Sequence, residues 1–158
     1  MFMLTKHYYK WKQDQAPLLY LVRNIVEITT GLILTIQDVI LNKFTDDNVH
    51  FHYSKASLRD GIVDVYIDCK LFMRIEALSI TLRKIKQTIL HRCRCIVFDE
   101  FIVNPRQNEK YLADETTKFK ELYTTNKRDR LDQNKPLKAY FLGNPYSLYN
   151  PYFVWLNI

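Results

Sequence analysis

Apolar residues along this chain occur either in short continuous runs or at helical spacing. The continuous, mainly apolar runs are 18–22, 95–98 and 137–142. Runs of this kind predict strands that are buried on both faces of a sheet. Helical spacing predicts amphipathic helices over 30–44, 78–89 and 111–126. Buried strands that alternate with amphipathic helices indicate an α/β fold with a mainly parallel sheet.

Residues 49–78 follow a different pattern. Apolar and polar side chains alternate over 49–53, which predicts a strand with one exposed face. Two further strands are predicted over Ile62–Ile67 and Leu71–Leu78. The short segment Asp68-Cys69-Lys70 between them predicts a tight turn. This region is therefore expected to form a β-hairpin inserted into the α/β fold.

The composition is that of one ordinary globular domain. Of the 158 residues, 47% are hydrophobic and 25% charged, and the three glycines and five prolines are too few for a linker. No stretch approaches the roughly eighteen apolar residues of a membrane span. The start, Met1 to Leu4 followed by Lys6, also lacks the pattern of a signal peptide. We therefore expect no membrane partner.

The charge distribution is mildly basic. The 23 Lys and Arg residues exceed the 17 Asp and Glu residues, which gives a formal net charge of +6. The segment between Ala77 and Phe98 contains no acid but five of the basic residues: Arg83, Lys84, Lys86, Arg92 and Arg94. A second basic group consists of Lys127, Arg128 and Arg130. Both groups suit nucleic-acid contacts, and both also fit a solvated helix face and a charged loop.

The cysteines and histidines do not form a metal or disulfide pattern. Cys69, Cys93 and Cys95 are an odd number, and Cys93 and Cys95 have no second cysteine pair with which to complete a four-ligand zinc site. His50 and His52 share one strand face but have no third ligand in sight, which favours a surface strand. Free thiols of this kind are typical of a reducing compartment.

The buried run at 95–98 leads directly into two carboxylates, Asp99 and Glu100. Open α/β sheets bind their ligands at the carboxyl ends of the strands. A nucleotide-hydrolysing enzyme needs one acid to hold Mg²⁺ and a second to orient or deprotonate water. The same pattern also fits a buried strand that ends in a solvated loop, so the acid pair alone leaves both interpretations open.

The next predicted strand also ends in polar residues, Gly143-Asn144-Pro145. If the two strands are neighbours, the Asn144 amide can hydrogen-bond a γ-phosphate or an attacking water near Glu100. The alternative is that Asn144 only begins a turn, as Asn-Pro often does. A nuclease that adds Asp64 and Asp68 to the acid pair is a weaker hypothesis, because nothing in the spacing brings these acids to a two-metal site.

Four segments, taken in order, resemble one known family. They are Leu19-Tyr-Leu-Val-Arg23, the hairpin around 66–71, Cys95-Ile-Val-Phe-Asp-Glu-Phe-Ile102, and Phe141-Leu-Gly-Asn144 with Asn150-Pro-Tyr-Phe153. The third segment is similar to the Walker B strand of the DNA-encapsidation ATPases of small, short-tailed phages, and the fourth to the strand and loop that follow it. The likeness is specific over 95–153 and loose before about Asp60.

This resemblance implies a RecA-like ASCE fold with ATP and Mg²⁺ as cofactors. Asp99 would hold the Mg²⁺ through water, Glu100 would polarise the attacking water, and Asn144 would sense the phosphate. Arg128 or Arg130 would reach the nucleotide of a neighbouring subunit, a role that suits a permanently charged, planar guanidinium. The implied partners are double-stranded DNA, other subunits of a ring motor and the portal vertex of a capsid, in the host cytoplasm.

The chain departs from this family at the phosphate-binding loop. A P-loop has the form Gly-x-x-x-x-Gly-Lys followed by Ser or Thr. Here the glycines are Gly31, Gly61 and Gly143, and none precedes a lysine. Family members carry the loop ahead of the strand that matches Leu18–Val22, where this chain has seventeen residues without glycine.

These observations lead to one expected domain and two candidate functions. We expect a single partial ATPase domain over residues 1–158, with an N-terminal extension over 1–16 and the Walker B half of the core over 17–158. The first candidate function is part of a DNA-packaging ATPase that is inactive as an isolated chain. The second is a non-enzymatic interaction or DNA-binding module derived from such a motor.

Overall fold

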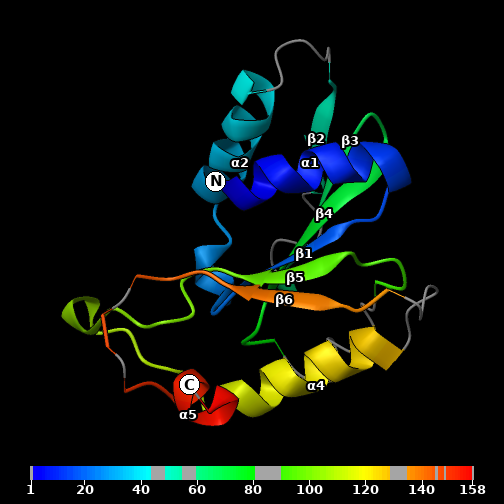
Figure 1. Cartoon of the computed structure of the whole chain (residues 1–158). Coiled ribbons are helices and arrows are strands. Elements are labelled where there is room, and N and C mark those ends of the chain that lie inside the picture. The colour runs from blue at the N-terminus through cyan, green and yellow to red at the C-terminus, as the bar shows by residue number, and fades with distance from the viewer. Residues whose placement is uncertain are drawn as a thin grey trace.

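A six-stranded mixed sheet forms the centre of the molecule (Figure 1). The computed structural model describes residues 2–43, 49–54, 60–80, 90–128, 135–144, 146–147 and 149–157. Across the sheet the strands follow the order β2-β3-β4-β1-β5-β6. Their bounds are Leu18–Val22 (β1), Phe51–Tyr53 (β2), Ile62–Ile67 (β3), Lys70–Ala77 (β4), Cys95–Phe98 (β5) and Lys138–Phe141 (β6).

The strands β4, β1, β5 and β6 run parallel to one another. Leu18 lies opposite Met73 on one side and Cys95 on the other, and Phe98 lies opposite Phe141. Every residue of β1 and of β5 is buried, as expected for strands with helices on both faces. The prediction of a mainly parallel α/β sheet is therefore confirmed.

The hairpin expected over 62–78 is present as β3 and β4, which pair antiparallel. Asp68 and Cys69 at its turn have φ angles of 48° and 62°, the left-handed conformation that matches a tight turn to the twist of the strands. β4 also pairs in parallel with β1, so the hairpin is part of the central sheet. β2 extends the sheet further by antiparallel pairing with β3.

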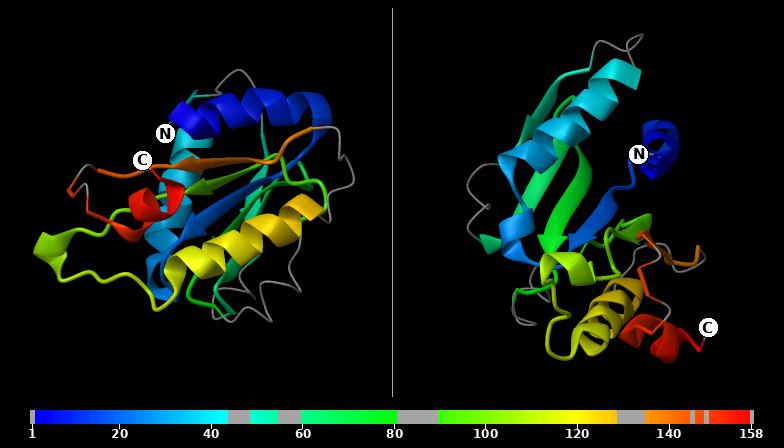
Figure 2. Two further views of the ribbon diagram at one scale, coloured as in Figure 1. Left: turned by 60° about the horizontal axis from the view of Figure 1, so that its bottom comes forward. Right: turned by 90° about the vertical axis from the view of Figure 1, so that its left-hand side faces the viewer.

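Helices cover both faces of this sheet (Figures 1 and 2). Their bounds are Phe2–Asp14 (α1), Thr30–Lys43 (α2), Glu115–Arg128 (α4) and Pro151–Leu156 (α5), with short 3-10 turns at Ile25–Glu27 (η1) and Pro105–Gln107 (η3). Alternate residues of β5 face opposite sides: Cys95 lies beside α1, whereas the Phe98 ring packs against Phe119 of α4 and Tyr152 of α5. None of the helices in the described part of the chain is long and apolar enough to cross a membrane.

The first sixteen residues, which the sequence suggested as an extension, mostly form α1. Tyr8 and Trp11 are buried on the sheet, where the Trp11 ring meets Phe72 edge-on at a centroid distance of 5.5 Å. The indole nitrogen of Trp11 donates to the carbonyl of Leu71 at 2.8 Å, and Nε2 of His7 bonds to the carbonyl of Phe72 at 3.1 Å. α1 is therefore attached to β4 both by apolar packing and by two specific hydrogen bonds.

Two predicted helices differ from the structure or lie outside it. The helix predicted over 78–89 lies largely in residues 81–89, outside the described residues. The helix predicted from Tyr111 begins at Glu115 instead. Tyr111 and Leu112 pack on the core from the preceding loop, and the Leu112 amide donates to the Glu115 carboxylate at 2.8 Å. Their apolar character thus reflects burial of a loop and not an earlier helix start.

We predict that His7 makes the protein less stable in mild acid. Burial lowers the pKa of His7 from 6.5 to about 4, so the folded chain keeps this imidazole neutral. Between these two values the unfolded chain binds the extra proton, and the free energy of unfolding falls as the pH falls from about 6.5 to 4. The loss amounts to at most about 3 kcal/mol. Urea unfolding at several pH values measures it.

The matched controls are His7→Gln and His52→Gln. Gln at position 7 can still donate to the carbonyl of Phe72 but does not titrate, so this variant should lose most of the dependence between pH 6.5 and 4. His52 is exposed on β2, and its replacement should leave the dependence unchanged. An identical pH profile for the wild type and His7→Gln would contradict the prediction.

Candidate functional site at the carboxyl ends of the strands

The two polar strand ends singled out in the sequence lie next to each other. β5 and β6 are paired neighbours, and the Leu142 amide donates to the Phe98 carbonyl at 2.9 Å. The Phe101 amide in turn donates to the Leu142 carbonyl at 3.2 Å. The segment that carries Asp99 and Glu100 is therefore hydrogen-bonded on both sides to the segment that leads to Asn144.

Asp99 is held by a tyrosine from the neighbouring strand. The Tyr20 hydroxyl on β1 donates to Oδ2 of Asp99, and Oδ1 accepts the Glu100 amide at 3.1 Å. Burial and the charge of Asp99 raise the pKa of Tyr20, so its hydroxyl stays protonated and remains a donor. This pair fixes the Asp99 carboxylate at the carboxyl edge of the parallel strands, where open α/β sheets bind their ligands.

Glu100 occupies a strained position directly after Asp99. Its φ angle is 50°, which is uncommon for a residue other than glycine, and such residues concentrate at functional sites. Its side chain is exposed. Partial burial and the neighbouring Asp99 raise the pKa of Glu100 above its usual range. A carboxylate with a raised pKa is a stronger base, as required of a group that activates water.

Asn144 follows β6, the strand next to the one that leads to the acid pair, and no contact between Asn144 and these acids is found among the described residues. The residue is exposed, and its amide nitrogen donates to the Tyr146 hydroxyl at 3.3 Å. A polar contact with phosphate or water near Glu100 would require this amide to turn away from Tyr146.

The predicted basic residues lie at the other end of the strands or outside the described residues. Arg128 is exposed in the last turn of α4, on the side where β5 and β6 begin (Figure 1). Arg92 is exposed just before β5, and Arg94 is half-buried and paired with Asp14. The residues outside the described part are Arg83, Lys84, Lys86 and Arg130.

A buried ion pair beside the acids was not anticipated from the sequence. Arg23 follows β1, and its Nε donates to Oε2 of Glu115 at 2.9 Å, with side-chain exposures of 4% and 1%. The Arg23 Nη2 donates to the Phe101 carbonyl at 2.7 Å, and the Tyr152 hydroxyl donates to Oε1 of Glu115 at 2.8 Å. The guanidinium also lies over the Phe98 ring at 5.8 Å. This network joins the end of β1, the loop after β5, α4 and α5.

The sequence contained a signal for part of this network. Arg23 and Asn24 end the buried run of β1, just as Asp99 and Glu100 end β5. The backbone amides of Arg23 and Asn24 donate to the Glu27 carboxylate at 3.1 and 2.9 Å, which fixes the turn η1. A charged residue directly after a fully buried strand was therefore a signal that Arg23, like Asp99, lies at the candidate site.

The positions of the acidic side chains bear on the metal and nuclease hypotheses. Within the described residues no group of three or more His, Cys, Asp or Glu side chains is arranged to hold a metal. Asp64 of β3 pairs with Arg74, and Asp68 accepts the His50 amide at 2.9 Å. β4 and β1 separate these acids from β5 in the sheet. The described geometry therefore gives no support to a two-metal nuclease built on Asp99.

Comparison with known proteins was informative only at the level of structure. No family model and no curated protein matches the sequence. Two solved structures share its fold. One is the N-terminal domain of the DNA packaging ATPase from bacteriophage phi29, with a TM-score of 0.71 and 22% sequence identity, covering 98% of this chain and 71% of that chain. The other is the Phi-28 gp11 DNA packaging motor, with a TM-score of 0.62 and 20% identity, covering 92% of this chain and 43% of that chain.

At these identities the likeness concerns the fold. It confirms the expected mainly parallel α/β fold, which the chain shares with a phage packaging ATPase domain, whereas the RecA-like core and the assignment of β5 as a Walker B strand stay predictions. The chain spans less than half of the gp11 motor, so the activity of a whole motor cannot be transferred to it directly.

We predict that Arg23→Met destabilises the protein strongly. The variant leaves the Glu115 carboxylate buried without its cation, and loss of one partner of a buried ion pair costs about 3–5 kcal/mol. Urea unfolding measures this change. Arg74→Met is the control, because its ion pair with Asp64 is more exposed, with side-chain exposures of 15% and 20%.

We expect the control to lose less stability than Arg23→Met, because its ion pair is only partly buried and water can reach the carboxylate that the substitution leaves behind. Arg23→Met combined with Glu115→Leu should recover much of the stability, because no buried charge is then left alone. Equal losses for Arg23→Met and Arg74→Met would show that the buried pair does not organise this site.

Proposed function

We propose that this chain is the hydrolytic part of a DNA-packaging motor ATPase with a RecA-like ASCE core. One observation carries the proposal: the acid pair Asp99-Glu100 directly follows the buried strand β5, in a fold shared with the N-terminal domain of a phage packaging ATPase. Both acids lie at the carboxyl edge of a parallel sheet, where nucleotide enzymes of this architecture place their chemistry.

In this proposal the residues at the strand ends have separate roles in ATP hydrolysis. Asp99, fixed by Tyr20, holds the water shell of Mg²⁺, and Glu100 polarises the water that attacks the γ-phosphate. The Asn144 side-chain amide turns away from the Tyr146 hydroxyl and hydrogen-bonds the γ-phosphate, and in this way it senses the phosphate. The raised pKa of Glu100 and the fixed orientation of Asp99 both support this division of roles.

A phosphate-binding loop would complete this site from outside the 158 residues. α1 begins on the side of the sheet where β1, β5 and β6 end (Figures 1 and 2). Among the described residues β6 pairs only with β5, which leaves its other edge without a strand. A further parallel strand beside β6, with a glycine-rich loop leading toward the start of α1, would cradle phosphate opposite Asp99.

The proposed assembly is a ring that moves double-stranded DNA toward a capsid portal. Arg128 lies at the end of α4 distant from Asp99, so it suits action on a neighbouring subunit better than action on its own. Arg130 has the same proposed role. Arg83, Lys84, Lys86, Arg92 and Arg94 are the proposed contacts to DNA.

We predict that the isolated chain hydrolyses ATP only at the background rate with Mg²⁺ present. Loss of a single catalytic donor costs on the order of 10²–10³ in rate, and here the whole phosphate cradle is missing. A coupled phosphate-release assay on the wild type and on Glu100→Gln should give the same rate for both. Robust activity that Glu100→Gln abolishes would show that this chain holds ATP without a P-loop.

The second candidate function is a non-enzymatic DNA-binding module. Its support is the basic segment around Arg92, which lies at the amino end of β5 and is exposed. If this surface neutralises backbone phosphates, the affinity for duplex DNA should fall steeply as salt is added. The logarithm of the affinity should then fall linearly with the logarithm of the salt concentration. We expect Arg92→Ala to reduce this slope by about one. Lys120→Ala, which removes an exposed lysine of α4, should leave it unchanged. A flat salt response would exclude phosphate contacts.

A further inference from the structure

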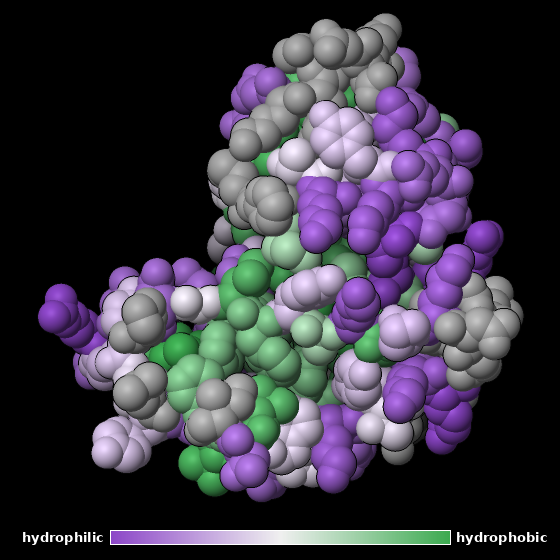
Figure 3. Space-filling model, viewed as in Figure 1, coloured by the Kyte–Doolittle hydropathy of each residue, from purple (hydrophilic) through white to green (hydrophobic). Residues whose placement is uncertain are grey.

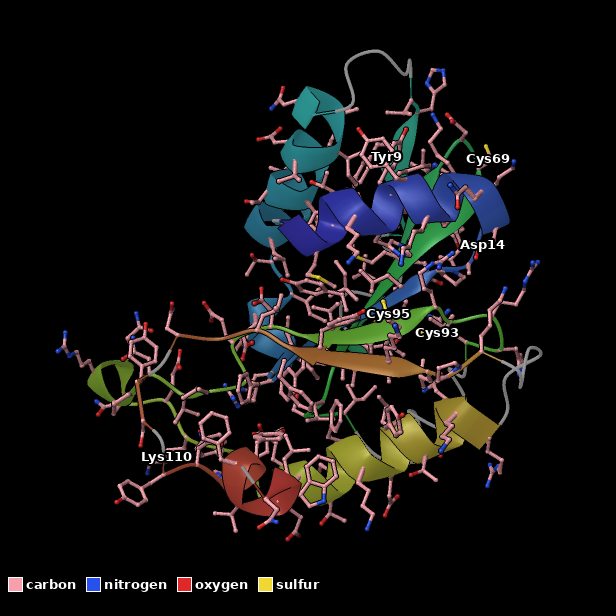
Figure 4. All side chains as sticks on the ribbon, viewed as in Figure 1. Tyr9, Asp14, Cys69, Cys93, Cys95 and Lys110 are labelled. Atoms are coloured by element: carbon pink, nitrogen blue, oxygen red, sulfur yellow. The ribbon has the colours of Figure 1, made fainter. Side chains whose placement is uncertain are left out.

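A groove lies between α1 and the sheet, away from the acid pair. It has a volume of about 390 Å³, within the range of small-molecule sites. One wall is α1 and the other is formed by the first residues of β5 and β6. Figure 4 shows Asp14 at the end of α1 on the side of Cys93 and Cys95, with Lys110 at the opposite side of the molecule.

One face of α1 forms the first wall. Met3, Lys6, His7, Lys10 and Asp14 all line the groove. Their spacing of three to four residues places them on one helical face. The hydrophilic side chains of α1 border an apolar area below it in Figure 3. The groove therefore lies at a boundary between charged and apolar surface.

The second wall combines flat apolar surface with cations. Cys95, Pro136 and Tyr140 contribute apolar atoms, and Lys138 contributes an exposed ammonium at the start of β6. Burial raises the pKa of the Cys95 thiol to about 11, so this wall carries no thiolate. A planar ring could pack between Tyr140 and the helix.

The charges that line the groove have one predominant sign. Six cationic side chains line it, against the single carboxylate of Asp14, which is already paired with Arg94. The cations are Lys6, Lys10, Arg92, Arg94, Lys135 and Lys138. A concave site with this balance concentrates anions.

Two residues that line the groove each carry a buried nitrogen without a partner among the described residues. His7 is only 3% exposed, and because its Nε2 bonds to a carbonyl, its Nδ1 must be an unprotonated acceptor. This Nδ1 has no hydrogen-bond partner, and neither does Nε of Arg94, which is a donor. Buried polar atoms are normally satisfied, so both atoms point to a ligand that offers a donor and an acceptor.

We propose that this groove binds a nucleoside monophosphate. The phosphate lies among the ammonium groups of Lys10 and Lys138, the base packs on the apolar wall, and an amino or hydroxyl group of the nucleoside donates to Nδ1 of His7. The site is separate from the acid pair, needs no Mg²⁺, and does not depend on the proposed packaging function.

Duplex DNA fits these features less well. A backbone phosphodiester offers acceptors but no donor for His7, and a paired base cannot enter a pocket of this size without leaving the stack. Free mononucleotide supplies phosphate, ring and donor together. Duplex binding is therefore the competing outcome of the test.

The test is a titration of the whole chain with AMP in EDTA, followed by calorimetry and ³¹P NMR. We expect adenosine and inorganic phosphate each to bind at least ten-fold more weakly than AMP. Lys10→Ala combined with Lys138→Ala should weaken AMP binding roughly ten-fold or more, because two charge-assisted contacts are lost. The matched control combines Lys110→Ala with Lys120→Ala, which removes two exposed lysines elsewhere and should leave the affinity unchanged.

Asp99→Asn separates this site from the proposed hydrolytic site. AMP affinity that is unchanged in Asp99→Asn and independent of Mg²⁺ supports the groove. AMP binding that needs Mg²⁺ or is lost in Asp99→Asn would place the nucleotide at the strand ends and overturn the proposal. Equal AMP affinity in the two double variants would also overturn it, as would duplex DNA binding that requires Lys10 and Lys138 while AMP does not bind.

Discussion

The buried pair of Arg23 and Glu115 determines how the parts of this molecule meet at the carboxyl edge of the sheet. Neither charge is stable in the interior alone, so each must keep its partner and its further hydrogen bonds. Glu115 begins α4 and accepts the Tyr152 hydroxyl of α5, while Arg23 follows β1 and donates to the carbonyl of Phe101. The loop with the acid pair lies between β5 and Phe101, so its course is fixed at both ends.

This constraint explains what could and could not be predicted from the sequence. The strands β1, β5 and β6 and the position of Asp99-Glu100 follow from local patterns, because a buried run and the residue after it are adjacent in the chain. The partners of Arg23 do not follow, since Glu115 is 92 residues away and no periodic pattern links the two. Tyr20 lies inside an apolar run that predicted burial correctly, but its hydroxyl contact with Asp99 depends on the pairing of β1 with β5.

The packing of α1 on the sheet is a second feature that could not be predicted from the sequence. By composition, residues 6–15 are polar and aromatic, and nothing local distinguishes an exposed segment from a helix on a sheet. Its attachment depends on Trp11 and His7, whose ring nitrogens bond to the main-chain carbonyls of Leu71 and Phe72, 60 and 65 residues further along. Such residues pack an apolar body and satisfy a polar tip, so their burial becomes evident only when the partner strand is in place.

The edge of β6 that pairs with no strand in the described part of the chain connects the proposed hydrolytic site with the proposed nucleotide groove. Lys138 and Tyr140 belong to β6 and also line the groove beside α1. A strand that paired with the free edge of β6 would lie next to both residues, and a loop from that strand to the start of α1 would pass the Met3 end of the groove. Completing the phosphate cradle would therefore change the walls of the groove. A ligand in the groove and a strand on β6 are consequently expected to influence each other's binding, through direct contact and not through a distant rearrangement.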